Sequence, residues 1–147
     1  MPGLDAGLIR EVIISDGGSG DATVPIAMAW GCEVVHGEAS RGGQLMRGCA
    51  AAKAPWLLVL HADSVLGSGW ITACVAHDDP ARAGWFDLAF DPVRWQGRTI
   101  AGLANLRSRF GLPYGDQGLF ISRVLYDEIG GYCDIALMED VAIARAL

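Results

Sequence analysis

Short apolar runs alternate along this chain with segments of helical periodicity, and no other feature restricts the fold as strongly. The most apolar run, Trp-Leu-Leu-Val-Leu at 56–60, has the length of a buried strand, and we place it centrally in the predicted sheet. Strands that alternate with helices usually form a parallel sheet with helices on both faces. The sequence therefore predicts an α/β fold, a three-layer and mostly parallel sheet, in a single domain over residues 1–147.

The predicted strands and helices follow one another without internal repeats or linkers. Ser40 and Thr23 are candidate N-caps, because their hydroxyls can accept a hydrogen bond from the first turn of a helix. Strands are expected at residues 11–15, 33–35, 56–60, 85–90 and 118–122. Helices are expected at residues 23–30, 41–53, 70–77, 99–110, 124–129 and 139–147, with Leu103, Leu106 and Phe110 on one face of the 99–110 helix.

Composition and charge exclude several classes of protein. A net charge of −6 makes the chain a poor non-specific binder of phosphate backbones, so nucleic acid is not an expected partner. No apolar run approaches ~20 residues and no signal peptide is visible, so a cytoplasmic chain without a transmembrane segment is expected. The cysteines form no CxxC pair and are expected to be reduced thiols: Cys32, Cys49, Cys74 and Cys133.

Polar residues follow the predicted strands at the ends where parallel sheets usually bind ligands. Asp16 ends the first strand and begins the turn Asp-Gly-Gly-Ser-Gly-Asp. A carboxylate at this place can accept hydrogen bonds from a base or a ribose, while glycines let the ligand approach. A dinucleotide-binding loop and a plain strand-to-helix turn are the alternative interpretations.

The segment His61-Ala62-Asp63 follows the central strand, and its carboxylate has the chemistry of an Mg²⁺ or Mn²⁺ ligand. His61 can be a second ligand or a hydrogen-bond partner, and a polar strand terminus is the alternative. Glu139 and Asp140 open a helix, where the helix dipole favours acids and where a carboxylate can also act as a general base. Arg41, at another helix start, can contact a phosphate or simply face solvent.

Taken together, these segments resemble the family 2 glycosyltransferases, which have the GT-A, nucleotide-diphospho-sugar transferase-like fold. The matching segments are EVIISDGGSGDAT (11–23), ASRGGQLMRGCAAAKAPWLLVLHADS (39–64), YGDQGLFISRVLYDEIGGY (114–132) and LMEDVAIARAL (137–147). The His-Ala-Asp, Tyr-Gly-Asp-Gln and Met-Glu-Asp pieces are most similar to a small bacterial subgroup, associated with arsenosugar biosynthesis or with radical-SAM and selenodomain proteins. Four weak motifs in this order and spacing are together specific.

The resemblance implies a metal-dependent inverting glycosyltransferase. Its donor would be a nucleotide sugar and its acceptor a hydroxyl of unknown identity. The DxD-like metal motif would be His61 and Asp63, holding Mn²⁺ or Mg²⁺, and Asp140 would be the catalytic base with Glu139 beside it. Asp116 and Gln117 would lie near the acceptor or the donor sugar. The implied donor-site residues are Asp16, Gly17, Gly18, Ser19, Arg41, Gln44 and Ala62.

The chain departs from the family pattern at both ends. The usual first strand and the usual C-terminal segment are not found in residues 1–147, which predicts an exposed sheet edge and a homodimer formed through it. A catalytically impaired remnant or interaction domain is therefore the main alternative. A nucleotidyltransferase is disfavoured, because the turn after the first strand carries acids where a triphosphate would need a basic residue.

Overall fold

The computed structural model describes the whole chain except residues 1, 92–94, 112, 114 and 136, so Tyr114 of the third matching segment lies outside the described residues. The strands within the described residues are β1 (Ile13–Asp16), β2 (Glu33–His36), β3 (Trp56–Val59) and β4 (Leu119–Ser122). The helices there are α1 (Pro2–Asp5), α2 (Thr23–Ala29), α3 (Arg41–Ala51), α4 (Trp70–Ala76), α5 (Trp95–Ser108), α6 (Arg123–Glu128) and α7 (Glu139–Ala146), and a 3-10 turn, η1 (Gly115–Gln117), precedes β4.

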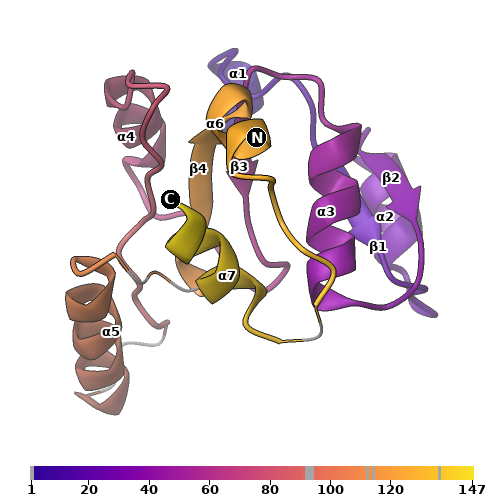
Figure 1. The fold of residues 1–147 in the computed structure, drawn as a ribbon. Helices are drawn as coiled ribbons and strands as arrows, with labels where there is room; N and C mark the ends of the chain where they lie inside the picture. Colours follow the sequence, from indigo (N-terminus) through magenta and orange to yellow (C-terminus); the bar gives the residue numbers. More distant parts are fainter. Residues whose placement is uncertain (1, 92–94, 112, 114, 136) are drawn as a thin grey trace.

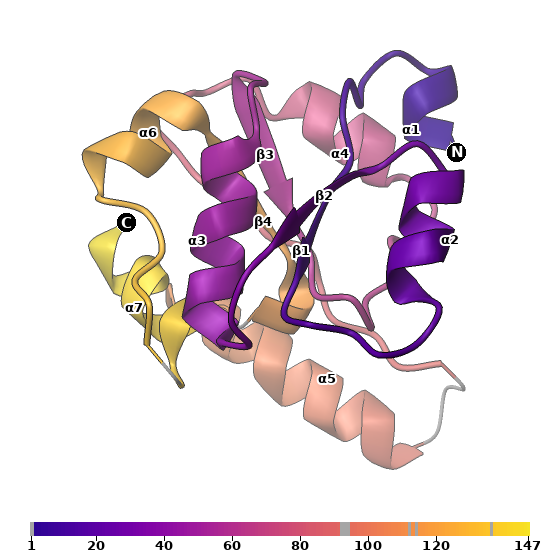
Figure 2. The same ribbon diagram turned by 90° about the vertical axis from the view of Figure 1, so that its right-hand side faces the viewer.

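The strands form two separate pairs. β1 runs parallel to β2, with Asp16 opposite His36, whereas β3 runs antiparallel to β4, with Val59 opposite Leu119. In Figure 2 the strands lie between α3, α6 and α7 on one side and α1, α2 and α4 on the other. The α/β expectation is confirmed, but one mostly parallel sheet is not found among the described residues. A connection as long as that between β3 and β4 permits either direction, and the observed register, from Trp56 opposite Ser122 to Val59 opposite Leu119, is antiparallel.

Helix α3 packs against both strand pairs and joins them (Figure 1). The Ser40 hydroxyl accepts a hydrogen bond from the Gly43 N–H at 3.2 Å, which confirms the predicted N-cap. The Gln44 side chain donates from Nε2 to the Ser15 carbonyl at 2.9 Å. This bond fixes the carboxyl end of β1 against the first turn of α3.

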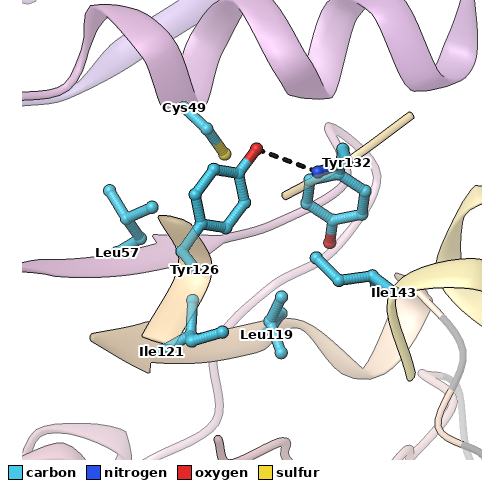
Figure 3. Close-up of a cluster of buried hydrophobic side chains, with 7 residues drawn as sticks. All are labelled: Cys49, Leu57, Leu119, Ile121, Tyr126, Tyr132 and Ile143. Carbon is cyan, nitrogen blue, oxygen red and sulfur yellow. Dashed lines mark hydrogen bonds between the residues drawn. The ribbon is translucent and has the colours of Figure 1, made fainter. Parts of the chain in front are cut away.

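The hydrophobic core lies between the β3–β4 pair and the helices α3, α6 and α7 (Figure 3). Ile121 at its centre has no solvent exposure. The Tyr126 hydroxyl lies within this core and accepts a hydrogen bond from the Tyr132 N–H at 3.1 Å. The buried members of the cluster are Cys49, Leu57, Leu119, Ile121, Tyr126, Tyr132 and Ile143.

Two local predictions are wrong. Residues 85–90 form no strand, because the Asn105 side chain bonds both the N–H and the carbonyl of Leu88, at 2.7 and 3.1 Å, and so occupies groups that a ladder would use. Only Gly84 forms an isolated bridge, to Phe120. Thr23 is not an N-cap, because α2 begins at Thr23 itself and its N–H bonds the Asp21 carboxylate.

Helix α5 begins four residues before the predicted 99–110 helix, ends two residues before its predicted end, and turns its apolar side chains outward. Leu103 and Leu106 lie on α5 and Phe110 lies in the turn just beyond it, and all three are exposed to solvent. No helix in the described part of the chain is long and apolar enough to cross a membrane. All four cysteines are free thiols, as expected.

Candidate functional site

Asp16 ends β1 with a carboxylate that organises the turn after the strand. The side chain is only 4% exposed. Its oxygens accept hydrogen bonds from the Gly18 N–H at 3.0 Å and the Ser19 N–H at 3.1 Å, and His36 Nδ1 lies 3.4 Å away. The Ser19 hydroxyl is the largest influence on this carboxyl, and with the backbone N–H groups it lowers the pKa of Asp16 to about 2 against the opposing effect of burial. Asp16 is therefore ionised at neutral pH.

Gly17 and Gly18 are required by the shape of this turn. A Cβ on Gly17 would lie 2.9 Å from Gln44 Oε1, so a side chain there would displace Gln44. Gly18 has a φ of 98°, a conformation that favours glycine. The predicted donor-binding residues of the turn thus lie beside Gln44, whose side-chain amide is already bonded to the Ser15 carbonyl of β1.

His61 and Asp140 meet at the carboxyl end of β3. His61 Nε2 lies 3.8 Å from Asp140 Oδ1, within ion-pair distance but beyond a good hydrogen bond. Both side chains are partly buried, at 23% and 15% exposure. Gly115 of η1 lies against them, and a Cβ there would overlap His61 Nε2 and lie 2.5 Å from Asp140 Oδ1. Only glycine leaves room for this contact.

The ionisation of the two side chains is coupled. The Asp140 carboxylate raises the pKa of His61, although burial opposes the shift. Burial raises the pKa of Asp140, but His61, the Gly115 N–H and Arg41 together lower it below its ordinary value. Asp140 Oδ1 is nevertheless a buried oxygen without a hydrogen-bond partner among the described residues. Such an atom is available to a proton or to a cation.

Glu139, the neighbour of Asp140, is held by Arg41 from the first turn of α3. Arg41 Nε donates to Glu139 Oε1 at 2.7 Å. The glutamate is 1% exposed, whereas the arginine is 55% exposed and reachable from solvent. Met138, immediately before, has a φ of 67° and is the one non-glycine residue with positive φ in the described part of the chain. Backbone strain of this kind often accompanies functional sites.

His61, Glu139 and Asp140 form a group that could hold a metal ion. One ligand atom from each lies within 4.8 Å of the others. Asp63, the carboxylate that the sequence favours as metal ligand, is exposed and is not part of this group. Ala62 beside it is exposed as well. The structure thus places His61 against Asp140, the predicted base, and not against Asp63, the carboxylate of its own motif.

The two residues predicted near the acceptor lie differently. Asp116 is exposed, but Gln117 is 2% exposed and its amide bonds Ser108 Oγ at 2.6 Å and the Phe86 carbonyl at 3.1 Å. Gln117 therefore faces the interior and supports the η1 turn. Gly115 is not among the predicted site residues, and its only signal in the sequence is its place in the third matching segment.

A second missed contact holds the loop before α7 against the start of α3. The hydroxyl of Ser40 donates to Asp134, and the Gly42 N–H donates to the Ile135 carbonyl at 3.3 Å. These bonds bring the first turns of α3 and α7 to the same edge of the molecule (Figure 1). They position Arg41 for its bond to Glu139.

Cavities do not by themselves mark this site. A cavity of about 20 Å³ beside Asp140 is lined by Pro113, Tyr132 and Ile143 among others, and has room for about one water. A larger hollow of about 420 Å³ is lined by His77, Asp79 and Trp85, among others. It lies at the opposite end of β3, because His77 contacts Trp56, the first residue of that strand.

A model of one protein family matches most of the chain. The family is described as Glycosyl transferase family 2, and the match covers residues 6–132. The matched span contains Asp16, Arg41, His61 and Asp63 but ends before α7. No curated protein and no solved structure matches the chain.

Proposed function

The chain belongs to glycosyl transferase family 2, and from this premise we propose that it moves a sugar from a nucleotide-diphosphate donor to an acceptor hydroxyl, with inversion at the sugar carbon. The observation that carries the proposal is the convergence of Arg41, His61 and Asp140 at one edge of the molecule. Asp140 lies outside the family match, so its place beside His61 supports its role independently.

Asp140 is the proposed general base. Its lowered pKa keeps the carboxylate ionised at neutral pH, and Oδ1 has no hydrogen-bond partner among the described residues that would compete for a proton. Oδ1 would take the proton of the acceptor hydroxyl as the hydroxyl oxygen attacks the sugar carbon. The bond from this carbon to the diphosphate then breaks, and the diphosphate leaves with the electron pair.

The donor would lie between the turn after β1 and the first turn of α3. Asp16, with its neighbours Gly17, Gly18 and Ser19, is proposed to face the nucleoside. Arg41 is proposed to contact the diphosphate, because it is 55% exposed and stands at a helix N-terminus, where the helix dipole favours anions. Asp116, exposed beside the Gly115 contact, is proposed to meet the sugar or the acceptor.

A divalent cation is part of the proposal, and the side chains present fit one. An imidazole nitrogen and carboxylate oxygens within 4.8 Å, one of them without a hydrogen-bond partner among the described residues, are suitable donors for Mn²⁺ or Mg²⁺. We assign His61 of this group to the ion, and Asp63, which is exposed and lies outside the group, on the sequence motif alone, since Glu139 is paired with Arg41. When bound, such an ion neutralises charge on a diphosphate. Asp140 as a direct ligand is the competing assignment.

Thermal unfolding with and without nucleotides tests the donor site. Wild-type protein would be heated with UDP, GDP or dTDP, each with and without Mn²⁺, beside Asp63→Ala and the control Asp127→Ala, an exposed acid on α6. Ligand at about a hundred times its dissociation constant adds ~2.7 kcal/mol, or roughly 5 to 10 °C. The metal-dependent shift should survive in the control and disappear in Asp63→Ala.

A non-catalytic domain of the same family is the second candidate. The cavity beside Asp140, with room for about one water, favours it because an acceptor could not reach the proposed base through a space of that size. Absence of a shift with every nucleotide, in protein that unfolds cooperatively, would support this candidate. A shift that persists in Asp63→Ala would keep donor binding and reject the metal assignment.

A further inference from the structure

Helix α5 carries the largest group of exposed apolar side chains on any helix in the described part of the chain. Each member is between 52% and 76% exposed. At 100° per residue, with the projection continued from the end of α5 to residue 110, they fall within an arc of about 140° on one side of the helix. The outer face is made of side chains on α5 and one in the turn two residues beyond its end: Trp95, Ile100, Leu103 and Leu106 on the helix, and Phe110 in the turn.

The orientation of α5 is fixed by polar contacts on its other side. Ser108 is 2% exposed, and its hydroxyl donates to Gln117 Oε1. Asn105 bonds the backbone of Leu88 through both its oxygen and its nitrogen, and Ala101 is buried. Turning the outer face inward would break these bonds. The apolar side chains therefore point away from the protein in its folded state, and in Figure 1 α5 stands apart from the strands.

The charge of α5 is opposite to that of the chain. Residues 95–110 contain three arginines and no acid, in a chain of net charge −6. On a helical projection continued to residue 110, Arg98 and Arg109 lie along one margin of the outer face, whereas Arg107, near the other margin, is half-buried with a buried guanidinium nitrogen. Arg98 and Arg109 are exposed. An apolar stripe beside an exposed cationic margin, with Trp95 at one end and Phe110 just beyond the other, is the pattern of a helix that lies on an anionic membrane surface.

We propose that the outer face of α5 docks on an anionic phospholipid surface, with its apolar side chains at the boundary between headgroups and acyl chains. A second copy fits the face less well, because two-fold packing of α5 on α5 would bring the arginines of both copies along one seam. The acidic remainder of the chain would be repelled by the same lipids, which leaves α5 as the contacting element. The docking does not depend on transferase activity.

Docking would bring the candidate site close to the bilayer. Gln117, which bonds Ser108 on the inner side of α5, belongs to the η1 turn. That turn also contains Gly115, which lies against His61 and Asp140. The connection between the membrane-facing helix and the proposed base is thus only a few residues long.

Sedimentation with lipid vesicles tests the proposal on the full chain. Vesicles of phosphatidylcholine alone would be compared with vesicles that contain about 30% phosphatidylserine. Wild-type protein should sediment with the anionic vesicles, and added salt should release it. The double variant Leu103→Ser, Phe110→Ser should bind roughly tenfold more weakly or worse. Arg98→Gln with Arg109→Gln should cost roughly thirtyfold on anionic vesicles only.

The matched control is Met28→Ser with Val124→Ser, which removes two exposed apolar side chains, on α2 and α6. It should bind like the wild type. Circular dichroism checks that every variant is folded. If the variant Leu103→Ser, Phe110→Ser does not fold, the variant Arg98→Gln, Arg109→Gln still tests the proposal. Equal loss in the control, or no binding of wild type to anionic vesicles, would overturn the proposal. So would a lipid-free dimer that Leu103→Ser, Phe110→Ser dissociates, since a second copy would then cover the face.

Discussion

At the scale of single residues, Asp140 can be tested as base or as ligand. Asp140→Asn keeps the size of the side chain but removes its basicity, so turnover should fall by about 10² to 10⁴. If Asp140 acts as the base, the metal-dependent thermal shift with the preferred nucleotide should persist. Loss of both turnover and shift would instead assign Asp140 to the ion. Asp127→Asn, an exposed change on α6, should alter neither measurement.

The sequence indicated which residues could form a site better than it indicated which side chains they contact. His61 and Asp63 are two positions apart in one motif, yet the structure places His61 against Asp140 and leaves Asp63 exposed. Motif spacing gives order along the chain but no distances between segments. The close approach of Gly115 follows from a missing side chain, which no periodicity signals. Gln117 has the polarity of a ligand contact, but its burial depends on the packing of α5.

At the scale of elements, the start of α3 depends on its cap. Ser40 satisfies the Gly43 N–H and also donates to Asp134, so Ser40→Ala should lower the free energy of unfolding by about 0.5 to 2 kcal/mol. Urea denaturation would measure the change. Ser40→Asp keeps an acceptor at the cap but brings a second carboxylate to Asp134, so it should recover only part of the loss. An unchanged midpoint in Ser40→Ala would show that the cap contributes nothing.

Elements with strong local signals could be predicted, and those decided by distant contacts could not. The Ser40 cap and the apolar run at 56–60 gave α3 and β3 to within two residues. The direction of β4 could not be predicted, because an apolar run has the same pattern in parallel and antiparallel pairing. Residues 85–90 have strand composition, but Asn105 takes the backbone groups of Leu88. Helical spacing placed Leu103 on a face without saying whether that face is buried.

At the scale of the whole molecule, one core joins the β3–β4 pair to three helices. Ile121 lies at the centre of this core and has no solvent exposure, so Ile121→Ala should lower the free energy of unfolding by about 2 to 5 kcal/mol. Ile121→Val should cost only about 0.5 to 1.5 kcal/mol. Ile26→Ala, at a position 56% exposed on α2, is the matched control and should be nearly neutral. Comparable losses in Ile121→Ala and Ile26→Ala, measured by calorimetry, would contradict the position of this core.

The stability of the whole fold should have an acid limb and an alkaline limb. Folding lowers the pKa of Asp16 from 3.8 to about 2, and the pKa of Asp140 also falls, so their contributions are present above about pH 4 and are lost as the pH drops towards 2. Folding raises the pKa of His61 above 6.5, so its contribution is present below that pH and is lost as the pH rises through the folded value. Unfolding midpoints would be measured from pH 2.5 to pH 9. Asp16→Asn should lower the midpoint at pH 7 and flatten the acid limb. His61→Gln should flatten the alkaline limb and also weaken the Asp140 part of the acid limb, because His61 lowers the pKa of Asp140. An acid limb that keeps its slope in Asp16→Asn would mean that the turn after β1 does not depend on the charge of this carboxylate.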